Sequence, residues 1–255
     1  MRFTLALGAA FLFAAGAAGA QTYDVVIESG RVMDPESGLD AVRNVGITGG
    51  RIEAVAEGPL RGRKVIDASG LVVAPGFIDL HWHGKDPASH LYQAMDGVTA
   101  SMELEIGVAD IDRWYAERAG REPIHYGAAI GHVPVRMAVK GDPGDFLPSG
   151  PGAKSALTEE ELAEIVRRIE HGLRRGAVAV GLGIAYTPAA TERELLEVFR
   201  LAAKHRAFAH VHIRGASSAA GANADREAGL LEAIALSAVS GAPVHIAHIQ
   251  SSGQA

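Results

Sequence analysis

Two histidines, one residue apart, end a stretch that otherwise has the character of a buried β-strand. They are His81 and His83 in the sequence GFIDLHWHG, residues 76–84. Side chains at positions i and i+2 of a strand project to the same face, about 7 Å apart. The pair therefore places two neutral nitrogen donors on one surface, and neutral imidazole is the commonest metal ligand in proteins.

Further side chains of the ligand type follow other apolar stretches: Glu103 and Glu105 within 97–107, His210 and His212 within 207–215, and His248 within 242–250. The chain has no cysteine, so a zinc site would have to use imidazole and carboxylate. A catalytic zinc keeps one position for water, and two ions about 3.5–4 Å apart can share a bridging carboxylate and hydroxide. The pattern indicates metal-assisted hydrolysis.

The elements that would position these side chains change in character at Pro75. Between residues 23 and 74, short β-branched runs and turn residues predict a small antiparallel sheet or half of a β-sandwich. After Pro75, six predicted strands alternate with helical patterns. The strands cover 76–83, 97–107, 124–134, 177–186, 207–215 and 242–250, and the helices lie near 88–96, 110–119, 158–173, 191–205 and 225–240.

Alternating strands and helices with apolar strands predict an α/β fold with a parallel sheet. A closed eight-unit barrel takes about 250 residues, but 180 residues remain from Gly76 onward. We therefore expect an incomplete TIM-type (β/α) barrel of about six of eight units, preceded by a small β-rich subdomain. An open doubly wound sheet is the alternative, although no glycine-rich dinucleotide-binding sequence follows its first strand.

The sequence of the first twenty residues predicts that the protein is exported. Residues 1–20 combine one basic residue, a short apolar run and a small-residue end, which is typical of a secretory signal peptide and predicts a periplasmic or secreted protein. The apolar run is too short for a membrane anchor, and no other segment predicts a stable membrane span. The expected organisation is thus 1–20 signal peptide, 21–75 β-rich part and 76–255 hydrolase barrel. A net charge of −6 without a cationic patch argues against a nucleic-acid partner.

Several of these motifs together resemble the amidohydrolase superfamily, and within it the D-aminoacylase (N-acyl-D-amino-acid deacylase) group. They run from about Tyr23 to the end of the chain and comprise APGFIDLHWHG, DGVTASMELEIG, GHVPVR, GLGIAYTP, HVHIRG and PVHIAHIQSSG. The resemblance implies that His81 and His83 bind one metal ion and that His212 and His248 bind the other. The expected cofactor is one or two Zn²⁺ ions.

The second strand departs from the family pattern. The D-aminoacylase group, which this chain resembles, has a cysteine ligand near the sequence GNCG. This chain has ELEIG at that place. A glutamate can act as a bridging ligand instead. We favour Glu105 over Glu103 because it lies nearer the cysteine position, with two solvated carboxylates as the alternative. Gln250, a further candidate for substrate binding, stands where the family tends to have lysine.

Other polar side chains are candidates for substrate binding or for structural roles. His132, Arg136 and Tyr186 could contact substrate or belong to loop structure, and Arg214 could bind a substrate carboxylate or neutralise nearby carboxylates. Of the remaining residues near the histidines, His210 is expected to be packing, ligand or ligand support, His245 to face the helices, and Asp79 to orient a ligand.

The resemblance implies a hydrolase of carbon–nitrogen bonds other than peptide bonds, acting on a small-molecule amide. It gives an N-acyl-D-amino acid as the expected substrate and a metal-activated hydroxide as the attacking group. The family's catalytic aspartate is expected beyond Ala255, so the 255 residues alone are expected to show negligible turnover. The alternatives are another amidohydrolase chemistry, such as a cyclic amidase, dipeptidase or deaminase, and a non-catalytic metal-binding protein.

Overall fold

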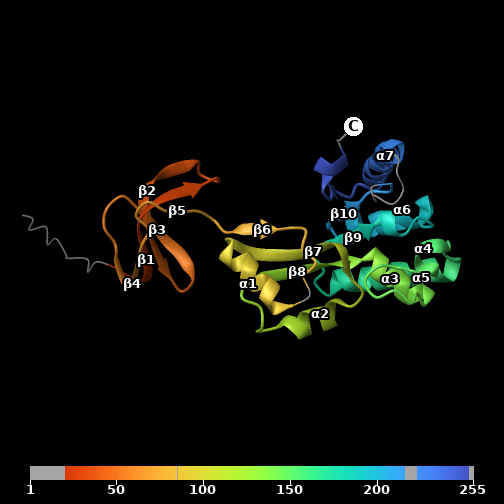
Figure 1. Ribbon diagram of the computed structural model, residues 1–255, viewed down its shortest axis with the longest axis horizontal. Helices are drawn as coiled ribbons and strands as arrows, with labels where there is room; N and C mark the ends of the chain where they lie inside the picture. Colours follow the sequence, from red (N-terminus) through yellow and green to blue (C-terminus); the bar gives the residue numbers. More distant parts are fainter. Residues whose placement is uncertain (1–20, 85, 216–222, 253–255) are drawn as a thin grey trace, which may run out of the picture. The chain divides into compact units, whose positions relative to one another are not determined.

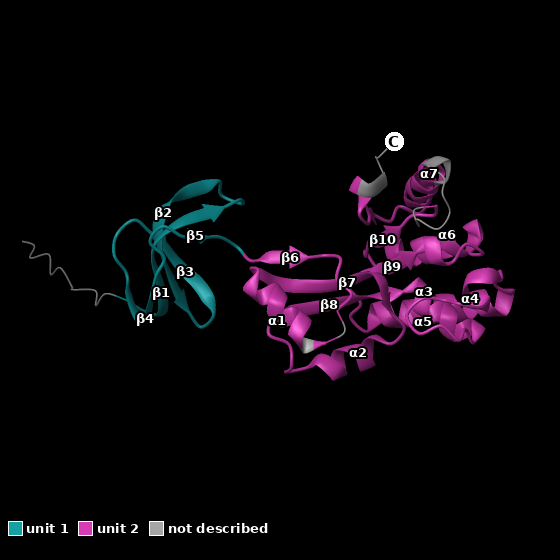
Figure 2. Cartoon of the chain, viewed as in Figure 1, with its two compact units in different colours: residues 1–75 teal, residues 76–255 magenta. Residues whose placement is uncertain are grey.

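The computed structural model describes residues 21–84, 86–215 and 223–252. The chain divides into two compact units, residues 1–75 and 76–255 (Figure 2). The predicted signal peptide, residues 1–20, lies outside the described residues. Within the described part of the chain, no helix has both the length and the apolar character that a membrane crossing requires.

The first unit is one five-stranded sheet around the long strand β1 (Figure 1). Its order is β3-β2-β1-β4, and β5 also pairs with β1. The expected β-rich part is confirmed. The β2 and β3 pairings are antiparallel, but β4 and β5 run parallel to β1, so the sheet is mixed and not the small antiparallel sheet that was one of the two expectations. The strands are β1 (Thr22–Asp34), β2 (Leu39–Thr48), β3 (Arg51–Ala56), β4 (Arg61–Asp67) and β5 (Val72–Val73).

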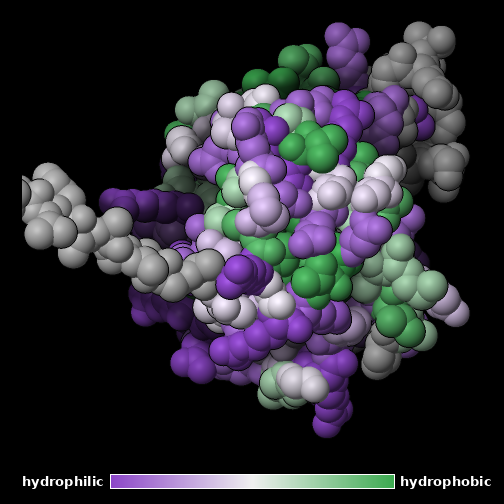
Figure 3. Space-filling view, turned by 90° about the vertical axis from the view of Figure 1, so that its left-hand side faces the viewer, coloured by the Kyte–Doolittle hydropathy of each residue, from purple (hydrophilic) through white to green (hydrophobic). Residues whose placement is uncertain are grey.

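The interior of this sheet unit is small, because few of its apolar side chains are buried. Val26, Val45 and Tyr23 are buried, whereas Ile52 and Val42 are more than half exposed. The space-filling view shows hydrophobic side chains gathered among hydrophilic ones on the face it presents (Figure 3).

The second unit contains the six-stranded parallel sheet that the sequence predicts, in the order β11-β10-β9-β8-β7-β6. All of its strand pairs are parallel. The sheet is curled like half of a barrel, which confirms the expected incomplete barrel fold. The strands are β6 (Phe77–Asp79), β7 (Val98–Val108), β8 (His125–Gly131), β9 (Val180–Gly183), β10 (Ala209–His212) and β11 (Val244–Ile246).

Helices follow the strands and pack in sequence, with α5 against α6 and α6 against α7. Two of them begin at a recognisable signal: Thr158 and Glu161 form a capping box at the start of α5, and Thr191 caps α6. The main core lies between these helices and the sheet. The helices are α1 (Pro87–Met95), α2 (Ile111–Arg118), α3 (His132–Lys140), α4 (Pro151–Lys154), α5 (Glu159–Arg174), α6 (Glu192–Lys204) and α7 (Asn223–Ser240), with one-turn 3₁₀ helices η1 (Ile184–Tyr186) and η3 (Ile249–Ser252).

Helix α3 was not expected, because its first turn overlaps the predicted strand 124–134. Its N-cap is Gly131, which offers no side-chain hydrogen bond, so the sequence lacks the usual start signal. The apolar side chains of Val133, Val135 and Met137 are nevertheless buried. The strand therefore ends at Gly131, and the chain turns at once into a buried helix.

A glycine on β9 allows the strand that carries Glu105 to approach closely. A Cβ atom at Gly181 would overlap the carbonyl oxygens of Leu104 and Glu105 on β7. Those are backbone atoms, so only a shift of the strand could relieve the overlap. Gly181 thus sets where β7 lies inside the curled sheet.

We expect Gly181→Ala to lower the free energy of unfolding by about 1–3 kcal/mol, as other overpacked cores do. Both tryptophans, Trp82 and Trp114, lie in the second unit, so tryptophan fluorescence in urea follows this unit. Gly127→Ala on β8 is the matched control, because there the flexible side chain of Met102 is the nearest neighbour. Equal costs for the two variants would contradict the close-approach argument.

Candidate metal centre

The carboxylate of Glu105 lies at the centre of four of the predicted ligands. Its Oε2 atom is 2.8 Å from Nε2 of His81 and 3.0 Å from Nε2 of His83. Its Oε1 atom is hydrogen-bonded to Nδ1 of His212 and lies 3.7 Å from Nε2 of His248. Each carboxylate oxygen therefore faces one histidine pair, which is the arrangement of a carboxylate that bridges two binding positions.

The donor atoms are close enough to share one ion. Ligand atoms of His81, Glu105 and His248 all lie within 4.8 Å of one another, and Nδ1 of His212 is 3.1 Å from Nε2 of His248. Nε2 of His212 is buried and has no hydrogen-bond partner among the described residues. Imidazole and carboxylate are the ligands that zinc accepts when thiolate is absent. The cluster therefore fits one divalent ion, or two that share Glu105.

Glu103 takes a different place from Glu105. Its Oε2 atom lies 2.8 Å from Nδ1 of His83, and its Oε1 atom accepts a hydrogen bond from the backbone N–H of Gly107. The contact with Nδ1 turns Nε2 of His83 toward Glu105. A carboxylate in this position orients a metal-binding histidine and fixes its tautomer. The geometry thus separates the two glutamates, with Glu105 in the cluster and Glu103 behind it.

The electrostatics of the cluster follow from these contacts. Burial would raise the pKa of Glu105, but hydrogen bonds from His212, His81 and His83 outweigh it and hold the pKa of Glu105 well below its usual range. Hydrogen bonds to Glu103 and Glu105 raise the pKa of His83 to about 10. Burial lowers the pKa of His248, with His212 adding to the effect. The carboxylate is therefore anionic and attracts positive charge.

The strand ends place these groups at one rim of the sheet. Glu105 belongs to β7 and His212 ends β10, while His81 lies just beyond β6. Asp79 accepts the backbone N–H of His81 at 2.9 Å and the side-chain amide of Gln93 at 2.6 Å. It therefore holds the chain at the point where it leaves β6, a role that agrees with the orienting role expected from the sequence.

The position of His245 differs from the sequence prediction. It was expected to face the helices, but it pairs with His210 across β10 and β11, and their Nδ1 atoms lie 2.9 Å apart. His210 is fully buried, and burial together with His245 lowers its pKa to about 3. Alternation failed because β11 ends at Ile246 and His248 has a φ of 36°, a conformation that is uncommon for a residue other than glycine. His248, beyond the end of the strand, contacts His212 instead, so its position gives no parity from which to place His245.

For His132 and Arg136 the structure favours a structural role over the substrate contact that was the other expectation. Both side chains are fully buried, and both contact the buried carboxylate of Glu194, at 2.7 Å from Nε2 of His132 and 2.8 Å from Nε of Arg136. Arg136 also donates to the carbonyl oxygens of Gly152 and Ser155. The expected substrate contact does not fit this geometry. The sequence missed Glu194 as the partner, because it lies in the first turn of α6, where acidic residues are common.

The other residues predicted to contact substrate differ in their surroundings. The hydroxyl of Tyr186 is 3.3 Å from Nδ1 of His212, so Tyr186 borders the metal centre. Arg214 is paired with Glu232 at 3.0 Å and donates to two backbone carbonyl oxygens, which agrees with the charge-neutralising alternative. Gln250 is exposed in η3. Substrate binding by Tyr186, Arg214 and Gln250 stays a prediction.

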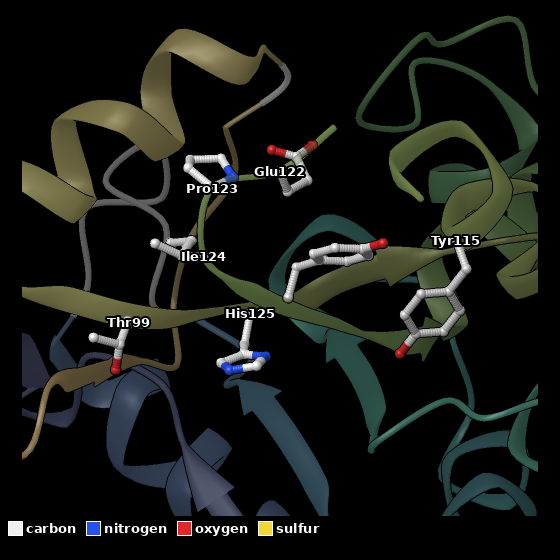
Figure 4. A pocket seen from close by; sticks show the side chains of 7 residues that line it. Thr99, Tyr115, Glu122, Pro123, Ile124 and His125 are labelled. Carbon is white, nitrogen blue, oxygen red and sulfur yellow. The ribbon is translucent and has the colours of Figure 1, made fainter. Parts of the chain in front are cut away.

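A cavity of about 690 Å³ lies at the opposite ends of β7 and β8 from these ligands (Figure 4). Its lining includes Thr99, near the start of β7, and His125, at the start of β8, together with Tyr115 and Glu122. It contains none of the predicted metal ligands. In parallel α/β barrels, functional groups gather at the carboxyl ends of the strands, so the metal centre rather than this cavity is the candidate site.

Comparison with known proteins identifies the family. The model of the amidohydrolase family matches residues 72–237, so the chain belongs to the amidohydrolase family. This confirms the resemblance inferred from the motifs.

Among individual proteins, the N-acyl-D-glutamate deacylase of Alcaligenes xylosoxydans xylosoxydans is 29% identical over 79% of this chain and 46% of its own length. The dihydroorotase of Citrifermentans bemidjiense is also 29% identical, over 91% of this chain and 56% of its own. The crystal structure of N-acyl-D-glutamate deacylase from Bordetella bronchiseptica, complexed with zinc and a phosphonate inhibitor, matches with a TM-score of 0.74 and 25% identity over 88% of this chain and 51% of that one. The chain thus spans about half the length of these relatives.

Removing the central carboxylate tests the metal centre. We expect Glu105→Gln to weaken zinc binding more than Glu103→Gln, for which a loss of about 10- to 100-fold is typical of a residue that only orients a ligand. Isothermal titration with zinc, with metal analysis after dialysis, measures both. Glu117→Gln is the control, because its pair with Arg113 is exposed. Undiminished zinc binding by Glu105→Gln would contradict the assignment.

The buried ion pair makes a separate prediction for stability. Burial would raise the pKa of Glu194, but the hydrogen bonds and charges of His132 and Arg136 lower it. A carboxyl group whose pKa is lowered on folding stabilises the protein above its unfolded pKa, and this stabilisation is lost as the pH falls through the folded pKa. We expect Glu194→Gln to cost about 3–5 kcal/mol at pH 7, because it leaves Arg136 buried without its anion.

Urea unfolding of Glu194→Gln between pH 3 and pH 7 should therefore show a smaller loss of stability toward acid than the wild-type protein shows. Glu159→Gln is the control, because Glu159 and its partner Arg193 are both exposed. Such surface pairs contribute about 0–1 kcal/mol. Parallel pH profiles for Glu194→Gln and the wild type would contradict the argument.

Proposed function

We propose that this protein hydrolyses the amide bond of an N-acyl-D-amino acid, with one or two zinc ions held by His81, His83, Glu105, His212 and His248. The observation that carries the proposal is the carboxylate of Glu105, each of whose oxygens faces one histidine pair. Support also comes from the amidohydrolase family and from the similarity to N-acyl-D-glutamate deacylases, one of which was crystallised with zinc.

The residues of the chain have defined tasks in such a reaction. A bound divalent ion would supply a Lewis acid that activates water and polarises the amide carbonyl. Glu103 holds His83 in the orientation that aims Nε2 at the centre. The hydroxyl of Tyr186, beside His212, is placed to donate a hydrogen bond to an amide oxygen bound at the rim. Asp79 holds the backbone of His81, and the buried His210 contacts His245 on the neighbouring strand.

A cyclic amidase is the second candidate. The dihydroorotase has the same sequence identity to this chain as the deacylase, and its match covers a larger share of the chain. The two reactions use the same metal chemistry and differ in the shape of the substrate. The deacylase proposal has the added support of the structural comparison with the Bordetella enzyme. Export to the periplasm or the medium is also part of the proposal, and its support is the sequence of residues 1–20.

The protein expressed from its complete reading frame should release the free amino acid from N-acetyl-D-amino acids, with a preference over the L-enantiomers of about 100-fold, a size that a shaped site can supply. Ninhydrin or chiral chromatography measures the release. Dialysis against EDTA should abolish it and zinc should restore it. Faster hydrolysis of dihydroorotate than of every N-acyl-D-amino acid would favour the cyclic amidase instead.

A further inference from the structure

The segment 142–150, between α3 and α4, brings an aromatic side chain against the metal centre. The rings of Phe146 and His83 are 5.7 Å apart and meet edge to face. The side chains of Phe146 and the adjacent Leu147 are only partly buried. An apolar group bound beside His83 would lie against the apolar surface of these side chains.

The same apolar surface reaches the other histidine pair. Phe146, Leu147 and Tyr186 all pack against one buried cluster, whose members are Ile106, Val133 and Met137. The ring of Tyr186 lies 4.8 Å from the ring of His212. We call Phe146, Leu147 and Tyr186 the apolar wall: Phe146 contacts His83, Tyr186 contacts His212, and Leu147 packs on the same buried cluster.

The segment has a fixed shape although it contains no helix or strand. The carboxylate of Asp142 accepts hydrogen bonds from the backbone N–H groups of Gly144, Ser149, Gly150 and Gly152, at 2.7–3.0 Å. Arg136 holds the following residues through the carbonyl oxygens of Gly152 and Ser155. A wall anchored at both ends presents Phe146 without a large ordering cost on binding.

We propose that this wall, and Phe146 in particular, selects the acyl group of the substrate and favours an apolar chain longer than acetyl. The inference rests on the proposed deacylase function. The first carbon of the acyl chain is bonded directly to the carbonyl carbon that reacts. The first side-chain carbon of the amino acid, Cβ, is three bonds away from that carbonyl carbon. A carbonyl held at the metal centre therefore directs its acyl chain to the groups that border the ligands, and Phe146 is such a group.

The size of the effect follows from apolar burial. Each methylene removed from water contributes about 0.8 kcal/mol, which is about fourfold in affinity. Hexanoyl has four more carbons than acetyl, and contact of about two of them with Phe146 would give a preference of roughly 15-fold. Phe146→Ala removes the ring and should remove most of this preference.

The test compares N-hexanoyl and N-acetyl derivatives of one D-amino acid, with the metal-loaded protein from the complete reading frame. The ratio of kcat/KM values should favour hexanoyl in the wild type, fall about 10-fold or more in Phe146→Ala, and stay near the wild-type ratio in Phe146→Leu. Leu231→Ala is the control, because Leu231 is exposed on α7. An unchanged ratio in Phe146→Ala, or a change that follows the amino acid rather than the acyl chain, overturns the proposal.

A binding measurement separates this proposal from the deacylase function. Isothermal titration of the zinc-loaded protein with hexanoate and acetate needs no turnover. Tighter binding of hexanoate that disappears in Phe146→Ala supports the wall, and equal binding of the two carboxylates by the wild type overturns it. Absence of amino-acid release from every N-acyl derivative refutes the deacylase function alone. Leu147→Ala provides a second variant should Phe146→Ala fail to fold.

Discussion

The candidate site depends on one carboxylate. Glu105 is almost completely buried, yet it is held as an anion because imidazole groups from three strand ends surround it. A buried anion requires compensating positive charge, and the imidazoles or a metal ion that they share can supply it. The two oxygens of the carboxylate divide the histidines into pairs. The backbone contact of Asp79 with His81 and the contact of Glu103 with His83 help to keep these two imidazoles aimed at Glu105.

A second buried carboxylate, Glu194, belongs to a charged network among the helices of this unit. Glu194 joins α6 to α3 through Arg136 and His132, and Arg136 continues to the carbonyl groups near α4. Such a network contributes little net stability compared with apolar packing, but breaking it leaves an unpaired charge in the core. Its value lies in fixing the relative positions of helices that carry the segment beside the site. The apolar wall and the metal ligands are therefore held by separate sets of interactions.

The sequence predicted the six parallel strands because their apolar runs and intervening helical patterns are local signals. It also predicted that His81, His83, Glu105, His212 and His248 would lie at one rim, since the carboxyl ends of parallel strands meet there. Two features near the site could not be derived from local sequence. The place of His245 depends on where β11 ends, which the pattern around Ile246 does not reveal. The burial of His132 and Arg136 depends on Glu194, which lies about sixty residues further along the chain.

The outermost strands of the half-barrel sheet have a consequence for how far the described sheet could be extended. Among the described residues, β6 pairs with β7 alone and β11 with β10 alone, so each has one side whose peptide groups face no neighbour in the sheet. Phe77 and Ile78 on β6 are largely exposed as well. Such an edge is a template for adding a strand from another molecule, but both strands are only three residues long. Their brevity limits the ladder that a second molecule could form, and so opposes edge-to-edge aggregation.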